Sequence, residues 1–181
     1  MTGVDFSGLD LSGACFDGAF LEHANLSRVV AREASFRRTV LVRTSLEGAS
    51  LERCVLEEAN VGRADLRGAT LQQCDFKGAV LERVVAEGLS FAGCRLEDAR
   101  FLESDLAGVR FDGAPAARAR FTQCRFAGAS FAGADLSQVD FSECTFPETD
   151  FRGATLERCS FSEYQGGAAL SAPPAPATSG S

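Results

Sequence analysis

The chain has 181 residues, enough for one ordinary domain, and 45% of them are hydrophobic. Its formal net charge of −7 argues against binding of nucleic acid through a general basic surface. No segment approaches the roughly eighteen consecutive apolar residues of a membrane-spanning helix, and no basic region followed by an apolar run marks a secretory signal. We therefore expect a soluble, cytoplasmic protein that contacts neither a membrane nor nucleic acid directly.

An apolar residue, usually a large one, occurs at every fifth position from Phe6 to Phe161, without insertion or deletion. Of these 32 centre positions, 14 are Phe and 14 are Leu. A straight α-helix turns about 100° per residue, and a straight strand alternates its faces, so neither would bury every fifth residue on one side. The chain must therefore turn a corner once in every five residues.

The residues that flank each centre position support a repeating corner. Two positions before the centre the residue is small, with 15 Ala and 6 Cys among 32 sites, and 14 of the 18 glycines share the phase two positions after it. Gly suits a corner because it adopts a positive φ without a steric clash. One five-residue unit cannot bury its centre alone, so the pattern predicts stacked coils with one shared core, which is an all-β solenoid.

The cysteines indicate the length of one coil. Cys54, Cys74 and Cys94 are spaced by twenty residues, as are Cys124 and Cys144, which predicts four five-residue units per coil. Because they occupy the small interior phase, we expect buried, reduced thiols that act as small hydrophobic residues. A metal ladder along the first three is the alternative, but it lacks CxxC spacing and a neighbouring His. We expect no metal site and no cofactor.

Units such as ADLRG at residues 64–68 resemble the pentapeptide-repeat family, and the resemblance extends over about residues 4–163. It implies a right-handed, quadrilateral, parallel β-helix of about eight coils, each built from four pentapeptides. We accordingly expect a β-helix over residues 1–164, with Tyr164 plugging the last coil. A disordered or linker-like tail rich in Gly, Ala, Pro and Ser is expected over residues 165–181.

No catalytic arrangement is apparent in the sequence. The only histidine, His23, falls in the corner phase. The segment GASFAG at residues 128–133 resembles a nucleophile elbow, but the repeat explains both of its glycines as corners and Ser130 as an outward residue. The Asp and Glu residues occupy outward phases, which favours solubility over acid–base catalysis. We expect a protein that is not an enzyme and that works by binding another protein.

Acidic residues gather near the C-terminal end of the repeat. Residues 126–163 carry seven acids against two bases, so these coils are the predicted contact for an electropositive partner. The quinolone-resistance branch of the family that the chain resembles is understood as an acidic, DNA-like rod that binds DNA gyrase or topoisomerase IV. The resemblance therefore implies DNA mimicry towards these enzymes and protection from fluoroquinolones. The predicted contacts are Asp135, Asp140, Glu143, Glu148 and Asp150.

The alternative function is a structural or adaptor module of a larger protein or assembly. Steps of twenty place Phe20, Val40 and Val80 in one outward column, with Asn60 between them, and exposed apolar patches often mark protein contacts. The arginine-rich residues 28–43 either contact an acidic partner or pair with neighbouring Glu side chains. Because uncapped solenoid ends tend to stack, a dimer or an end-to-end association is also expected.

Overall fold

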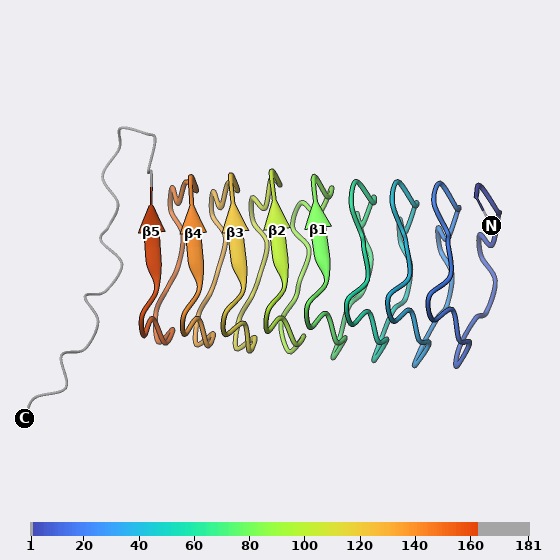
Figure 1. The fold of residues 1–181 in the computed structure, drawn as a ribbon, viewed down its shortest axis with the longest axis horizontal. Helices are drawn as coiled ribbons and strands as arrows, with labels where there is room; N and C mark the ends of the chain where they lie inside the picture. The colour runs from blue at the N-terminus through green and yellow to red at the C-terminus, as the bar shows by residue number, and fades with distance from the viewer. Residues whose placement is uncertain (1, 163–181) are drawn as a thin grey trace, which may run out of the picture.

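The computed structural model describes residues 2–162, whose coils stack along one axis into a rod (Figure 1). Five short strands form one parallel sheet in the order β1-β2-β3-β4-β5. Their bounds are β1 Val80–Glu82, β2 Arg100–Leu102, β3 Arg120–Thr122, β4 Asp140–Ser142 and β5 Ser160–Ser162. The predictions for Tyr164 and the tail at 165–181 lie outside the described residues. Within residues 2–162, no helix is long and apolar enough to cross a membrane.

The coils repeat in steps of twenty residues. Val80 of β1 pairs with Arg100 of β2, and the same step relates each later strand to the next. Isolated parallel bridges carry this step to the other sides of the rod and back to the bridge between Asp5 and Asn25. The predicted all-β solenoid with four pentapeptides per coil is therefore confirmed.

The corners share one left-handed backbone conformation. All corner-phase residues over 3–158 have φ between 47° and 72°. The predicted role of glycine is confirmed at 14 of them, but the other 18 hold larger residues such as Arg38. A non-glycine residue in this region costs roughly 1–2 kcal/mol. Two backbone hydrogen bonds hold the corner against this cost, from Arg38 N–H to the carbonyl of Glu57 (2.9 Å) and from Thr39 N–H to that of Phe36 (3.2 Å).

The centre side chains form a continuous apolar axis inside the rod. Phe76 and Phe131 are fully buried, as predicted. Towards the C-terminus the phenyl rings stack between coils, with the centroid of Phe111 lying 5.3 Å from that of Phe91 and 4.7 Å from that of Phe131. The interplanar angles are 4° and 6°. Such pairs contribute about 0.5–1.5 kcal/mol each beyond the burial of apolar area, so the core itself holds the coils in register.

The cysteines belong to this core. As predicted, five thiols are buried and free: Cys54, Cys74, Cys94, Cys124 and Cys144. The Cys94 thiol donates to the carbonyl oxygen of Leu71 (2.8 Å). Hydrogen bonding to the thiols of Cys54 and Cys94, together with burial, raises the pKa of Cys74. This disfavours the thiolate form that metals and electrophiles require. Residues 2–162 contain no group of three His, Cys, Asp or Glu side chains that could hold a metal ion.

Candidate protein-binding surface

The outward side chains form columns along the rod. Each pentapeptide exposes its corner residue and the residues directly before and after its centre, and each such position recurs every twenty residues. An outward residue therefore has neighbours in its own column roughly 4.8 Å away, in the coil before and the coil after. It has a further neighbour two residues away across the centre, because alternate residues of an extended segment point to the same side.

Opposite charges pair along these columns in the middle coils, which we define as residues 28–125. Arg38 Nε lies 2.8 Å from Glu58 Oε2, and Arg95 Nη1 lies 2.9 Å from Asp75 Oδ2. Pairing with Glu, the second alternative for residues 28–43, is found at three of the five arginines there. The middle coils carry 16 Lys and Arg against 14 Asp and Glu, so they present little net charge.

The C-terminal coils, defined as residues 126–162, carry six acids against two bases. Asp150 Oδ2 lies 2.7 Å from Arg152 Nη2, and hydrogen bonds from the side chain and backbone of Arg152 lower the pKa of Asp150 to about 2. None of the other five acids makes an ion pair with a described residue. The acidity of these coils is therefore largely uncompensated.

The five predicted acidic contacts share this end of the rod but not one side of it. Asp140 lies on β4, Asp135 lies on the preceding side, and Asp150 lies two corners further along the coil. Glu143 and Glu148 occupy corners with φ of 54° and 57°. The structure thus brings Asp140 and Glu143 together on the side that carries the strands and distributes the other three around the rod.

The predicted apolar residues do form one column. Parallel bridges link Phe20 to Val40, Val40 to Asn60 and Asn60 to Val80, in line with the first residues of the later strands. Phe20 is 61% exposed, whereas Val40 and Val80 are half-buried. Val85, on the next side of the rod, is 46% exposed and was not singled out from the sequence, although its outward phase was the available signal. That the column binds a protein remains a prediction.

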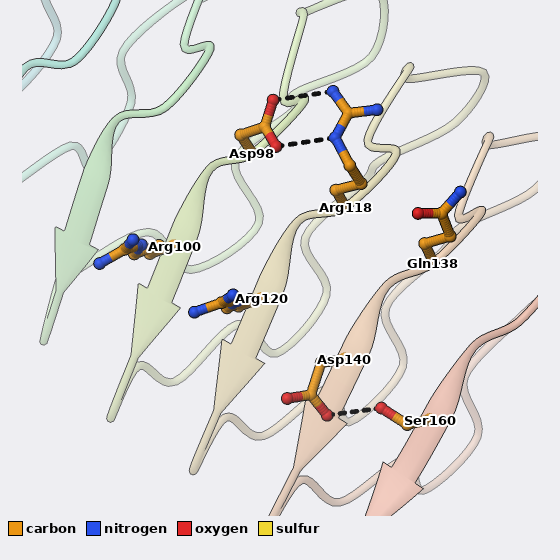
Figure 2. A pocket seen from close by; sticks show the side chains of 7 residues that line it. All are labelled: Asp98, Arg100, Arg118, Arg120, Gln138, Asp140 and Ser160. Atoms are coloured by element: carbon orange, nitrogen blue, oxygen red, sulfur yellow. Dashed lines mark hydrogen bonds and ion pairs between the residues drawn. The ribbon is translucent and has the colours of Figure 1, made fainter.

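A groove of about 440 Å³ crosses the surface beside β2, β3 and β4. Arg100 and Arg120 are register partners on β2 and β3, and both lie in this groove (Figure 2). Beside them Arg118 donates to both carboxylate oxygens of Asp98, at 2.9 and 2.8 Å. The remaining lining residues are Gln138, Asp140 and Ser160. Arg100 and Arg120 were not among the predicted contacts, although the sequence carried the signal as two arginines twenty residues apart.

A second groove, of about 420 Å³, includes His23. His23 occupies a corner with φ of 58°, as its phase predicts. Arg43 and Arg63 line this groove together with Glu22 and Glu82. The formal charges of these four side chains cancel, so the groove presents no net charge to a ligand.

Two family models match the sequence. The one described as pentapeptide repeats (8 copies) matches residues 1–28, 21–57 and 44–83, and the one described as pentapeptide repeat region matches residues 94–169. No curated protein matches the chain.

Solved structures are similar to this chain. A trypsin-treated form of QnrB1, a plasmid-mediated fluoroquinolone resistance protein, is 16% identical over 88% of this chain and 91% of that chain, with a TM-score of 0.57. HetL, a pentapeptide repeat protein involved in heterocyst differentiation regulation from the cyanobacterium Nostoc sp. strain PCC 7120, is 23% identical over 88% and 85% of the two chains, with a TM-score of 0.46. From its matched repeats and its four-sided coil, this chain belongs to the pentapeptide-repeat family.

Proposed function

We propose that the chain is a non-enzymatic rod that binds another protein, and that the C-terminal coils make the contact with an electropositive partner. The observation that carries this proposal is the uncompensated charge there, since Asp150 alone among six acids has an ion pair within the described residues. A solenoid fixes the backbone positions of these acids before binding, so little backbone entropy is lost on association. Complementary charge would also accelerate the encounter with the partner.

The specific partner that we propose is DNA gyrase or topoisomerase IV, bound by mimicry of DNA, with protection from fluoroquinolones as the consequence. Support comes from the family resemblance and from the fold shared with QnrB1, which is described as a fluoroquinolone resistance protein. The contacts would be five acids of the C-terminal coils, whose carboxylates take the place of the DNA phosphates as negative groups: Asp135, Asp140, Glu143, Glu148 and Asp150. A cytoplasmic location follows from this partner.

A supercoiling assay with purified gyrase, with and without a fluoroquinolone, tests the partner. The full chain is expected to inhibit supercoiling, or to protect it from the drug, at micromolar concentration. One variant neutralises four unpaired acids of the C-terminal coils, and about tenfold more of it should be needed. Its substitutions are Asp135→Asn, Asp140→Asn, Glu143→Gln and Glu148→Gln.

A matched control removes the same number of charges from the other end of the rod, where residues 2–22 carry four acids and no Lys or Arg. Its substitutions are Asp5→Asn, Asp10→Asn, Asp17→Asn and Glu22→Gln. This control should act like the unaltered chain. Equal loss in both variants would contradict the assignment to the C-terminal coils. An unaltered chain without effect at micromolar concentration would contradict the topoisomerase partner.

The alternative, a structural or adaptor module, is favoured by a different observation. The apolar column begins with Phe20, which is 61% exposed, and aromatic residues are enriched at protein interfaces. An adaptor role predicts that Phe20→Ala weakens capture of the physiological partner, whereas the C-terminal charge variant does not. The two variants therefore separate the two functions.

A further inference from the structure

Charged neighbours within one column of the rod almost always have opposite signs. The column at the side before the strands reads Asp17, Arg37, Glu57, Lys77 and Glu97, with strict alternation. Among residues 2–162, like charges follow one another at a step of twenty in only two places. These are Arg43, Arg63 and Arg83 at one corner, and Arg100 with Arg120 on β2 and β3.

Like charges directly opposite each other on adjacent strands are destabilising. A glutamate at position 100 would give Arg120 the type of partner that Arg53 has in Glu33, twenty residues before it. The contact between Arg100 and Arg120 therefore lowers the stability of the fold, whereas the alternating charges of the other columns stabilise it. Departures from local rules of this kind are expected at functional sites.

The groove around these arginines leaves their charge available. Asp98 is occupied by both hydrogen bonds from Arg118, and Asp140 accepts a hydrogen bond from the hydroxyl of Ser160 at 2.7 Å (Figure 2). Neither Arg100 nor Arg120 makes an ion pair with a described residue. Three arginines and two aspartates line the groove, so its formal charge is +1.

The other run of like charges, Arg43, Arg63 and Arg83, does not leave its positive charge available to a ligand. Arg43 and Arg63 share their groove with Glu22 and Glu82, which cancel their charge. Arg83, the third member of that run, pairs with Glu103. The groove at β2 and β3 is therefore the better anion site of the two.

We propose that Arg100 and Arg120 bind a carboxylate, supplied by an Asp or Glu side chain of a partner protein. Two planar guanidinium groups one strand apart offer parallel N–H donors that match the two oxygens of a carboxylate. A single negative charge balances the formal charge of the groove, whereas a phosphate dianion exceeds it by one charge and is repelled more strongly by the carboxylates of Asp98 and Asp140. The site goes beyond the acidic contact proposed above, because it binds a group of the opposite sign.

The two sites together would orient a partner along the rod. The carboxylate site lies on β2 and β3, and Asp140 and Glu143 follow in the next coil on the same side. A partner that engages both must carry an acidic group and a basic group in that order, about one to two coil spacings of roughly 4.8 Å apart. A partner of reversed polarity would meet like charges at both places, which disfavours it.

Side-chain NMR of the arginine Nε–Hε groups tests the carboxylate site in the intact chain. Sodium acetate is the probe and inorganic phosphate the competitor class, at constant ionic strength and pH 8. The signals of Arg100 and Arg120 should move along a saturating curve, with half-saturation on the order of tens of millimolar acetate for so exposed a contact. The affinity for phosphate should be at least about threefold lower than that for acetate. The signals of Arg43 and Arg63 should shift in proportion to the acetate concentration, without saturation.

Substitutions at these arginines and at a control pair complete the test. Arg100→Gln should abolish saturation of the remaining Arg120 signal, and Arg120→Gln should abolish it at Arg100. The matched control Arg43→Gln with Arg63→Gln should leave both curves unchanged. Arg100→Glu should also abolish saturation at Arg120 while raising Tm by about 1–2 °C, because the like-charge contact becomes an ion pair and the other register partner of position 100 is the uncharged Val80. A linear response at Arg100 and Arg120, tighter binding of phosphate, or a lower Tm for Arg100→Glu would overturn the proposal.

Discussion

The middle coils and the C-terminal coils share one backbone but differ in what their surface charges meet. In the middle coils, Arg95 and Asp75 illustrate a ladder of ion pairs between successive coils. In the C-terminal coils, Asp150 is the one acid of six with an ion pair among the described residues, and its partner Arg152 lies in the same coil, across the centre. The difference teaches that the solenoid determines where outward side chains meet, while their identity can change from coil to coil without affecting the core. A binding surface can therefore be placed on any stretch of the rod.

The largest expected effect tests whether the two regions really share one core. Phe111→Ala in the middle coils and Phe131→Ala in the C-terminal coils each remove a fully buried ring. Each should lower the free energy of unfolding by about 3–5 kcal/mol. Urea denaturation followed by circular dichroism measures this loss. Phe20→Ala, at a ring that is 61% exposed, is the control and should cost less than about 1 kcal/mol. Two separate transitions, in place of one cooperative transition, would mean that the regions unfold separately.

A smaller effect should separate paired from unpaired charges. Arg95→Gln removes a partner of Asp75, whose side chain is 21% exposed, and should cost about 0.2–1 kcal/mol at low salt. Glu148→Gln removes a charge that has no ion pair within residues 2–162 and should cost nothing measurable. Thermal unfolding at low salt and at high salt checks both, because screening should reduce the effect at Arg95 alone. The opposite order of effects would contradict the contrast between the regions.

The smallest effect concerns pH in the C-terminal coils. Arg152 lowers the pKa of Asp150 to about 2, below the roughly 3.9 of an unfolded chain. Because the folded-state pKa is the lower one, this contribution to stability is complete above about pH 4 and is lost as the pH falls towards 2. The Tm difference between the unaltered chain and Asp150→Asn should therefore shrink to zero over that range. Asp135→Asn is the control, and a difference for Asp150→Asn that stays constant would refute the linkage.

Much of the fold could be predicted because each position in the five-residue unit has one steric role. Phe131 is buried and Phe20 is exposed for the same reason, namely their phase in the repeat. The corner prediction was incomplete, because Arg38 adopts the φ that glycine suggested. Two hydrogen bonds from the neighbouring backbone hold that corner, and no local pattern in the sequence reveals them.

The site was less predictable, because each charged side chain has several possible partners. Arg67 has Glu47 and Glu87 in its own column, yet it pairs with Asp65 across the centre, with Nη2 2.5 Å from Oδ2. Arg120 and Asp140 are register partners but make no ion pair among the described residues. Within the part of the chain that the structure describes, the charge of Arg100 remains unpaired in its groove because neighbouring side chains pair in this way with other residues.

By itself, the sequence determined which residues lie inside, outside and at the corners, since these roles follow from steric needs that recur within five residues. Only the tertiary structure decided which charges are neutralised and which remain available. Stacking brings residues twenty apart within reach, and the reach and rotamers of competing side chains then select the partner.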